Sequence, residues 1–244
     1  MNTLIAGNWK TNLLADSAQA LAQAVRDHCN QTNVCVIPPA LYAGKVAELL
    51  ATSDVALGLQ DISDQGMGAT TGDICAQQAV DVGAKYVLVG HSERRVRQFE
   101  TSDLVARKAL AAASAGLVPI VCVGESLDDR EAGRHEQVVG EQLAPVIQAL
   151  GTVMDCVVAY EPVWAIGTGK TASAEQAQAM HAVIRRMLVD AGKGQTKILY
   201  GGSVNAANAA ELAACPDVNG ALVGGAALTI ESFAVIVKAF TEQN

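Results

Sequence analysis

The sequence has no run of basic residues of the kind that nucleic-acid-binding proteins carry. Lysine and arginine together number 17, against 25 aspartates and glutamates, so the formal net charge at pH 7 is -8. Phosphate backbones are bound mainly by clustered lysine and arginine side chains. We therefore expect no nucleic-acid partner, and an anionic ligand must be bound by a few local groups.

Long apolar stretches are also missing. The N-terminal segment MNTLIAGNWK has only a short apolar patch and no preceding basic segment. No apolar stretch reaches the roughly 18 residues that would suggest a membrane-spanning helix, and a secretory signal would begin with positive charge. The sequence predicts a soluble, cytoplasmic protein that does not associate with a membrane.

Cysteine pairs at short spacing are missing as well. The six cysteines form no Cys-x-x-Cys pair, and four of them lie in or beside apolar runs. Such pairs are the usual signature of zinc sites and redox centres, whereas buried free thiols behave as small apolar side chains. We expect free thiols and no metal site.

No linker rich in serine, proline or glycine, and no block of charge, divides the chain. Of its 244 residues, 50% are hydrophobic and 17% are charged, which suits one large apolar core. We expect a single domain over residues 1–244.

Short apolar runs recur along the chain, and segments with the apolar spacing of surface helices separate them. Runs without alternation are typical of parallel strands that are buried on both faces. The eight runs are residues 4–6, 34–37, 55–59, 86–89, 118–123, 156–160, 198–200 and 221–223.

Two helix starts carry a capping pattern, Asp16 with Gln19 and Ser173 with Gln176. The first side chain can accept a hydrogen bond from a free N–H of the first turn, and the glutamine can bond back. Eight strand-helix alternations within about 250 residues predict an α/β protein with a closed (β/α)8 barrel. An open, doubly wound sheet is the alternative. In the barrel, chemistry belongs at the carboxyl ends of the strands.

Residues 159–173, AYEPVWAIGTGKTAS, end like a nucleotide-binding P-loop. A P-loop needs a glycine five residues before Gly169, where the backbone curls around the phosphates, and that position is Trp164. We therefore interpret the segment as a strand, then Glu161, then a lid that starts at Pro162 and whose apolar residues could exclude water. A carboxylate at a strand end is, by itself, as often a surface residue as a base.

The segment GHSERR, residues 90–95, follows the fourth apolar run. His91 lies where a strand becomes a short helix, and the free N–H groups there disfavour protonation of the ring. A single histidine at such a position is more often a packing or capping residue. We interpret His28, His135 and His181 as surface or packing residues.

The segment GNWK, residues 7–10, ends the first run. Asn8 offers a hydrogen-bond donor and Lys10 a compact positive charge, which together suit an anionic substrate. Taken alone, Lys10 is more commonly a surface lysine.

Paired glycines follow the seventh and eighth runs, in YGGSV at residues 200–204 and LVGGAAL at residues 222–228. Glycines let backbone N–H groups approach a phosphate at a helix N-terminus, which is the usual phosphate position in such barrels. One pair often marks only a tight turn. Two pairs in these loops are more specific and predict a phosphate site.

These motifs, together with CVGE at residues 122–125, stand in the order and position found in the triosephosphate isomerase family, which essentially the whole chain resembles. The resemblance implies a closed (β/α)8 TIM barrel. It also implies an enzyme of glycolysis and gluconeogenesis that interconverts dihydroxyacetone phosphate and D-glyceraldehyde 3-phosphate through an enediol(ate), without a cofactor.

The resemblance also implies roles for single residues. Glu161 would remove the proton beside the carbonyl, and a neutral His91 would polarise that carbonyl and shuttle protons. Lys10 and Asn8 would stabilise the oxyanion and hold the phosphate. Backbone or hydroxyl groups of four further residues would bind the phosphate: Gly167, Ser203, Gly224 and Gly225.

Two supporting residues follow from the same comparison. Glu93 resembles an acid that influences Lys10, and Cys122 resembles a residue packed behind the base. A helix-surface position for Glu93 and a plain core thiol for Cys122 are the alternatives.

Family members usually form homodimers, in which the loop after the third strand lies beside the partner's counterparts of Asn8 and Lys10. Here that loop is DQGMGATTGD, residues 64–73, and its Thr71 and Gly72 match the family pattern. Five positions depart from that pattern: Asp61 replaces a typical Asn, Thr70 a common aromatic, Asp73 a usual Glu, Asn219 a usual Asp and Ala227 a frequent Ser.

Two other functions remain open. A non-catalytic phosphate-binding barrel would keep the glycine pairs but lose the proton-transfer set, and here Lys10, His91 and Glu161 are all present. Another barrel enzyme acting on a phosphorylated metabolite would explain the glycine pairs but not the lid segment.

Overall fold

The computed structural model describes residues 3–31, 33–151, 155–165 and 172–242. Its eight parallel strands pair in chain order, and β8 pairs back with β1. The predicted closed barrel is therefore confirmed, and the open sheet is wrong. The strands are β1 (Leu4–Asn8), β2 (Val34–Ile37), β3 (Ala56–Leu59), β4 (Ala84–Val89), β5 (Val118–Val123), β6 (Val157–Tyr160), β7 (Lys197–Tyr200) and β8 (Gly220–Val223).

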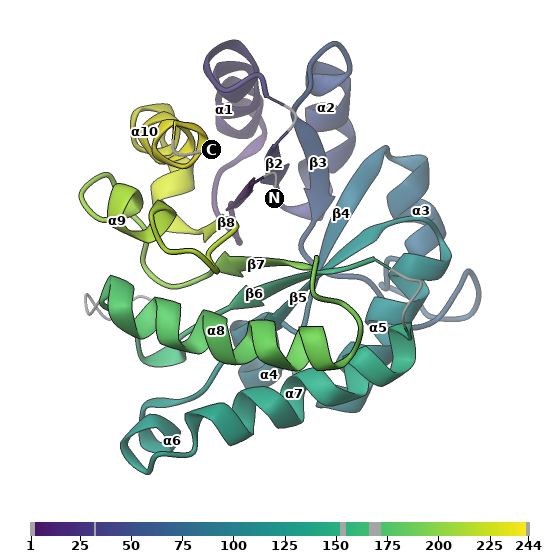
Figure 1. Cartoon of the computed structure of the whole chain (residues 1–244). Helices are drawn as coiled ribbons and strands as arrows, with labels where there is room; N and C mark the ends of the chain where they lie inside the picture. The colour runs from purple at the N-terminus through teal and green to yellow at the C-terminus, as the bar shows by residue number, and fades with distance from the viewer. Residues whose placement is uncertain (1–2, 32, 152–154, 166–171, 243–244) are drawn as a thin grey trace.

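Helices surround the barrel on the outside (Figure 1). They are α1 (Ala15–His28), α2 (Ala40–Leu50), α3 (Ala76–Asp81), α4 (Ser92–Arg97), α5 (Ser102–Ser114), α6 (Leu127–Glu131), α7 (His135–Leu150), α8 (Ala174–Asp190), α9 (Ala209–Ala213) and α10 (Ile230–Thr241). Two short 3-10 helices, η1 (Val163–Ala165) and η2 (Gly225–Leu228), follow β6 and β8.

The strands carry apolar side chains on both faces. On β1, Leu4 and Ala6 belong to the cluster inside the barrel, whereas Ile5 belongs to the cluster between the barrel and the helices. The same alternation occurs on β5, where Ile120 and Cys122 face inward. Because neither face contacts water, the strands read in the sequence as uninterrupted apolar runs.

The two predicted capping patterns have different outcomes. At α8, the Ser173 hydroxyl accepts the N–H of Gln176 at 3.2 Å, and the Gln176 side chain accepts the N–H of Ser173 at 3.0 Å, so this prediction is confirmed. At α1 the prediction is wrong. Leu14 is the capping residue, its N–H donates to the Ser17 hydroxyl at 3.0 Å, and Asp16 lies in the first turn.

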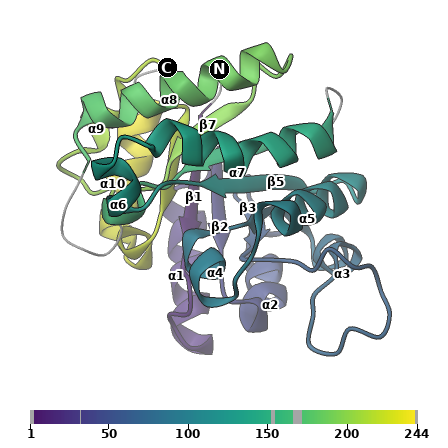
Figure 2. The same ribbon diagram turned by 90° about the horizontal axis from the view of Figure 1, so that it is seen from below.

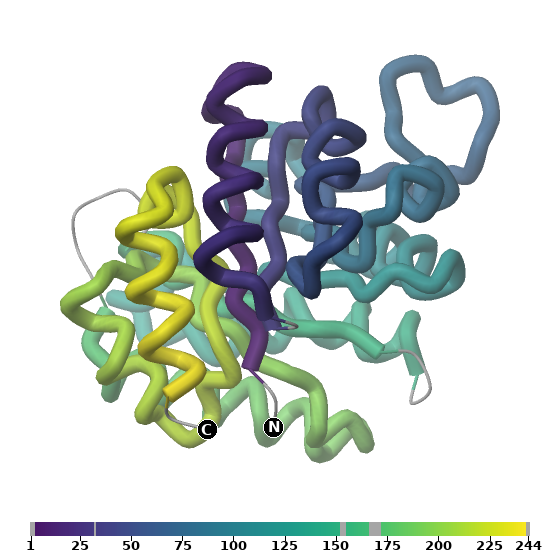
Figure 3. The backbone as a smooth tube through the Cα atoms, turned by 90° about the horizontal axis from the view of Figure 1, so that it is seen from above, coloured from purple at the N-terminus to yellow at the C-terminus, as the bar shows by residue number. Residues whose placement is uncertain are grey.

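The loop of residues 64–73, between β3 and α3, projects away from the barrel (Figures 2 and 3). Its two ends are joined at the base. The Ser63 N–H donates to the Ile74 carbonyl at 2.8 Å, and the Ser63 hydroxyl donates to Asp73 Oδ2 at 2.7 Å. Arg107 Nε adds a 2.7 Å ion pair with Asp64. The projecting loop is thus anchored to the body of the protein.

All six cysteines fall within the described ranges and have free thiols. Across those ranges, no helix combines the length and the apolar character needed to cross a membrane.

Closure of the barrel requires a glycine at position 220. This residue starts β8 opposite Leu4 of β1, has φ +136°, and a Cβ there would overlap the Leu4 carbonyl. We expect Gly220→Ala to lower the free energy of unfolding by about 2 to 4 kcal/mol, because it adds both a clash and a disfavoured backbone angle. Urea denaturation followed by circular dichroism measures this change.

The matched control is Gly44→Ala. Gly44 lies inside α2, is exposed, and a Cβ there would meet only Val82 Cγ2 at an ordinary 3.8 Å. Alanine in a helix interior should stabilise the protein by about 0.5 to 1 kcal/mol. Equal effects of the two substitutions would contradict the closure argument.

Candidate active site

Polar residues that follow five of the strands meet in one cleft at the carboxyl end of the barrel. The cleft has a volume of about 540 Å³ and is lined from the ends of β1, β4, β6, β7 and β8. Of the residues that the sequence placed around a substrate, Gly167 lies outside the described residues. The others all line the cleft: Asn8, Lys10, His91, Glu93, Glu161, Ser203, Gly224 and Gly225.

Glu161 follows β6 and is only 2% exposed. Its Oε1 lies 3.0 Å from Nε2 of His91, and its Oε2 accepts the backbone N–H of Ser92 at 2.9 Å. Two glycines leave room for this residue, because a Cβ on Gly124 would overlap the Glu161 carbonyl and one on Gly201 would lie 2.9 Å from Glu161 Cγ. The cleft therefore contains a carboxylate that is shielded from water and held at both oxygens.

Burial raises the pKa of Glu161, because a charged carboxylate is poorly solvated inside a protein. The charge and hydrogen bond of His91, the Ser92 N–H and the charge of Lys10 lower this pKa by more, so it lies below its ordinary value. Glu161 is therefore ionised at neutral pH and can accept a proton.

His91 caps α4. Its Nδ1 accepts the backbone N–H of Glu93 at 3.2 Å, so in the neutral ring the proton is on Nε2, which faces Glu161. Burial lowers the pKa of His91, but the charge and hydrogen bond of Glu161 raise it by more, and the net shift is upward. The expectation that the helix N-terminus would keep this pKa low is wrong here, because a carboxylate at 3.0 Å outweighs the N–H groups.

Lys10 reaches the cleft from a strained turn after β1. Its φ is +50°, which is uncommon for a residue other than glycine. The Lys10 N–H donates to Asn8 Oδ1 at 3.0 Å, and Gln60 Nε2 donates to the Lys10 carbonyl at 2.7 Å. The ammonium lies 2.6 Å from Glu93 Oε1. Sequence reasoning missed Gln60, although a polar residue directly after the third apolar run was the available signal.

The glycine pairs also border the cleft. Gly224 follows β8 and Gly225 begins η2, and a Cβ on Gly224 would lie 3.4 Å from Lys10 Cε. The Ser203 hydroxyl donates to the Ala165 carbonyl at 2.6 Å, which ties the turn after β7 to the segment after β6. Gly201 and Gly202, the other predicted glycine pair, also line the cleft. Sequence reasoning did not assign roles to the remaining lining residues: Asn12, Val204, Leu222, Ala226 and Leu228.

The two supporting residues occupy different environments. Cys122 lies inside the barrel on β5, where burial and the negative charge of Glu161 raise the pKa of its thiol well above the ordinary value. It is therefore a neutral packing residue. The Glu93 side chain is 48% exposed, and its carboxylate contacts Lys10 at 2.6 Å and lies 3.7 Å from His91 Nδ1.

Trp164, which excludes a P-loop, lies in η1 just after Glu161. Its indole N–H donates to Glu125 Oε1 at 2.8 Å, and the Tyr160 hydroxyl donates to the same oxygen at 3.0 Å. Arg130 donates to this oxygen as well, at 3.1 Å, and its guanidinium lies over the Trp164 ring at 5.2 Å. The start of the predicted lid is thus anchored. Residues 166–171 of that lid lie outside the described residues.

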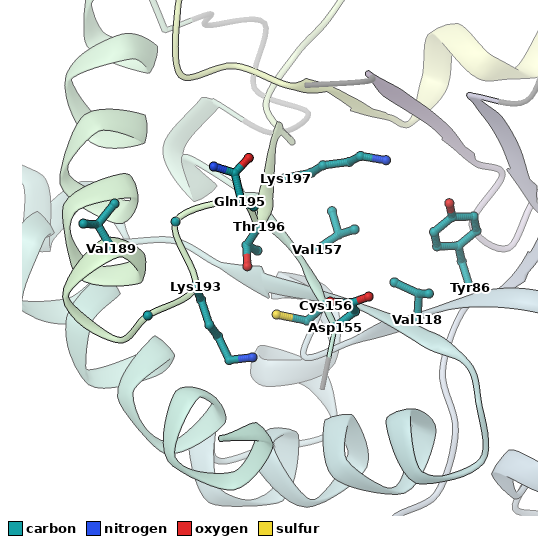
Figure 4. Close-up of a pocket in the computed structure, with 12 residues that line it drawn as sticks. Tyr86, Val118, Asp155, Cys156, Val157, Val189, Lys193, Gln195, Thr196 and Lys197 are labelled. Carbon is teal, nitrogen blue, oxygen red and sulfur yellow. The ribbon is translucent and has the colours of Figure 1, made fainter. Parts of the chain in front are cut away.

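A second cavity, of about 620 Å³, lies at the other end of the barrel (Figure 4). It is lined by residues that start strands, such as Val118, Val157 and Lys197. Ligands in such barrels bind at the carboxyl ends of the strands instead. The cleft around Glu161 is therefore the candidate active site.

Comparisons with known proteins give matches over nearly the whole chain. The family model described as triosephosphate isomerase matches residues 3–240. A protein of Albidiferax ferrireducens named triosephosphate isomerase is 51% identical over 241 residues, covering 96% of this chain and 97% of that protein. The protein of that name from Thiobacillus denitrificans is also 51% identical, over 242 residues and 97% of each chain. The one from Halorhodospira halophila is 48% identical over 245 residues, covering 98% of each.

The coupling between Glu161 and His91 can be tested by titration. We expect Glu161→Gln to lower the pKa of His91, because the substitution removes the negative charge that raises it and leaves burial and Lys10, which lower it. Nitrogen-15 NMR of the labelled histidine rings measures this pKa directly.

His181 is the internal control in the same spectra. It is fully buried, burial lowers its pKa to about 4, and Glu161 is not among the groups that shift it. A His91 pKa that stays at its wild-type value in Glu161→Gln would show that the contact does not control the ring.

Proposed function

The chain belongs to the triosephosphate isomerase family, and we propose that it interconverts dihydroxyacetone phosphate and D-glyceraldehyde 3-phosphate by proton transfer through an enediolate. It is an isomerase enzyme of a triose phosphate. We place this reaction in glycolysis and gluconeogenesis, in a single-domain cytoplasmic protein.

One observation carries the proposed mechanism. A buried carboxylate that is ionised, a histidine with its Nε2 3.0 Å away and a lysine ammonium border the same cleft. These groups are a base, a hydrogen-bond donor and a positive charge, which are what proton abstraction next to a carbonyl needs. The non-catalytic alternative does not explain why a charged carboxylate is kept away from water.

In the proposed reaction, Glu161 takes the proton from the carbon next to the carbonyl. The electron pair of that C–H bond forms the double bond of the enediolate, and the carbonyl oxygen becomes negative. His91 Nε2–H and the Lys10 ammonium stabilise this oxygen. His91 gives its Nε2 proton to this oxygen and takes the proton of the neighbouring hydroxyl, so that the negative charge moves to the hydroxyl oxygen. Glu161 then returns its proton to the former carbonyl carbon, and the neighbouring C–O becomes the carbonyl of the aldehyde.

Glu161 must release the Ser92 N–H and His91 before it can reach a substrate carbon, since both of its oxygens are engaged. Once it moves away, burial and Lys10 dominate the environment of His91 and lower its pKa. A neutral imidazole is then the favoured form, as the proposed role of His91 requires.

The phosphate group is proposed to lie between Lys10 and the paired glycines. Asn8, Ser203, Gly224 and Gly225 line the same cleft as Lys10. Gly224 and Gly225 have no side chain beyond Cα, so their backbone N–H groups are accessible to an anion. We propose Gly167 as a further ligand from its position in the sequence alone.

We also propose that two copies of the chain form a homodimer through the loop of residues 64–73. Large apolar residues are exposed after the first four strands, where they would be covered by a second copy. They are Leu14, Leu41, Met67, Val96 and Phe99, with exposed fractions of 76%, 91%, 76%, 68% and 84%.

A neighbouring cavity suits small residues of the partner's loop. It has a volume of about 300 Å³ and is lined by Asn8, Lys10, Gln60 and Glu93, among others. Thr71 and Gly72 are exposed residues of this loop, next to Asp73 at its base, and are small enough to enter the cavity. The partner's loop would then contact the same residues that position the Lys10 ammonium, which makes the site dependent on the dimer.

A coupled assay tests the reaction. Purified protein with dihydroxyacetone phosphate and a chelator should produce glyceraldehyde 3-phosphate, detected by an added dehydrogenase. Glu161→Asp should lower kcat by about 100-fold or more, because its shorter side chain holds the carboxylate away from the substrate carbon. Affinity for an unreactive substrate analogue should change much less.

Glu131→Asp is the control, since Glu131 is an exposed residue of α6 outside the cleft. An inactive wild-type protein that still binds the analogue would favour the non-catalytic phosphate-binding barrel. An active wild-type protein with an equally active Glu161→Asp variant would remove Glu161 from the role of base.

Sedimentation velocity tests the dimer. We expect a dimer for the wild type and a monomer for Met67→Asp at micromolar concentration, because an unpaired carboxylate in an apolar interface costs several kcal/mol. Val189→Asp is the control, since Val189 is 55% exposed and lines the cavity at the opposite end of the barrel. A wild-type monomer, or a dimer that survives Met67→Asp, would contradict the proposed interface.

A further inference from the structure

Arg95, the last residue of the GHSERR segment, lies in α4 but directs its guanidinium away from the cleft. Arg95 Nε donates to the Gly90 carbonyl at 2.9 Å, and Nη2 donates to the Cys122 carbonyl at 3.1 Å. Nη1 donates to the Ser102 hydroxyl at 3.3 Å. The residue is partly buried and does not line the active-site cleft, so it cannot contact a substrate there.

The first of these contacts holds the turn that carries His91. Gly90 is the residue between β4 and His91, and its φ of +69° is a left-handed angle. A Cβ on Gly90 would lie 2.7 Å from Val105 and 3.0 Å from Arg95 Nη2. The turn is thus confined by packing on one side and by the guanidinium on the other, which limits where the His91 ring can point.

The contact of Arg95 with the Cys122 carbonyl holds β5, the strand to which the Glu161 backbone is hydrogen-bonded. The Cys122 carbonyl lies near the end of β5, one residue before Val123, whose carbonyl accepts the Glu161 N–H at 2.7 Å. A single guanidinium therefore bridges the ends of β4 and β5. These two ends determine the distance between His91 and Glu161.

We propose that Arg95 is a positioning residue for proton transfer, which bridges the Gly90 and Cys122 carbonyls and thereby holds the His91 turn at its working distance from Glu161. This inference rests on the proposed function. It assigns a role to a residue that touches neither the substrate nor the reacting atoms.

Arg95 also contributes a positive charge behind Glu161. Burial lowers the pKa of Arg95, and the negative charge of Glu161 offsets part of this shift. Among the described residues, three others that titrate face Glu161 from separate elements: His91 after β4, Lys10 after β1 and Cys122 on β5. Loss of the Arg95 charge makes protonation of the Glu161 and His91 pair easier. The acidic limb of the pH profile of kcat/KM, which reports this pair, then moves to higher pH.

Two substitutions separate bridging from charge. Arg95→Met removes the donors and the charge but keeps much of the side-chain length. It should lower kcat by about 10- to 100-fold, because small misplacements of reacting groups reduce rates by such factors. KM should change by no more than about threefold. The acidic limb of the pH profile of this variant should move to higher pH. Arg95→Lys keeps the charge but cannot bridge both carbonyls, so its kcat should fall while its acidic limb stays at the wild-type position.

The control is Arg186→Met, because Arg186 is an exposed residue of α8 with only a 3.7 Å ion pair to Glu136. It should leave kcat and the pH profile unchanged. Circular dichroism identifies variants that fail to fold, and Arg95→Lys keeps the test decisive if Arg95→Met is one of them. Wild-type kcat in a folded Arg95→Lys, or a raised KM with unchanged kcat, would overturn the proposal.

The outcome for Arg95 can be told apart from failure of the proposed function. If the wild type does not isomerise triose phosphates, the function fails in the same assay. The His91 titration by nitrogen-15 NMR needs no turnover, and Arg95→Met should raise the pKa of His91, because a nearby positive charge has been removed. An unchanged His91 pKa in Arg95→Met would contradict the proposal that the Arg95 charge acts on Glu161 and His91. This conclusion does not depend on whether the wild type is active.

Discussion

Pairing of β1 with β8 closes the sheet, and the cleft depends on this closure. Leu4 stands opposite Gly220 at the start of the pair, where only a glycine can approach the Leu4 carbonyl. Just beyond the carboxyl ends of these two strands, Lys10 and Gly224 are neighbours although they are far apart in the sequence. Because all the strands are parallel, their carboxyl ends lie on one side of the barrel. A positive charge and an exposed backbone therefore meet in one place.

A second constraint is the charge on Glu161. Taking a carboxylate out of water costs several kcal/mol unless other groups replace the lost hydration. His91, the Ser92 N–H and the more distant Lys10 supply that replacement and keep the pKa of Glu161 low. The same contacts raise the pKa of His91, so the base and the hydrogen-bond donor control each other's proton. Arg95 sets their separation from outside the cleft in our proposal.

Much of the fold and of the candidate site was predictable, and the exceptions have physical reasons. The strands were predicted because burial on both faces favours an unbroken apolar run in the middle of each strand. The cap at Asp16 failed because Ser17, one residue later, makes the local hydrogen bond instead. In the sequence, Asp61 was recognised only as a departure from a family pattern. In the structure, both of its carboxylate oxygens lie 2.8 Å from the buried Lys108 ammonium. Burial raises the pKa of Asp61 to about 6. That pairing joins residues far apart in the chain.

The sequence by itself determined the alternation of eight strands with helices, the exclusion of a P-loop by Trp164, and which polar residues stand at strand ends. Each of these follows from the properties of single residues and their near neighbours. Only the tertiary structure decided that Glu161 lies 3.0 Å from His91, that Gln60 holds the carbonyl of Lys10, and that Arg95 bridges two strands. Such contacts depend on the curvature and register of the closed sheet, because these bring distant residues within a few ångströms of each other.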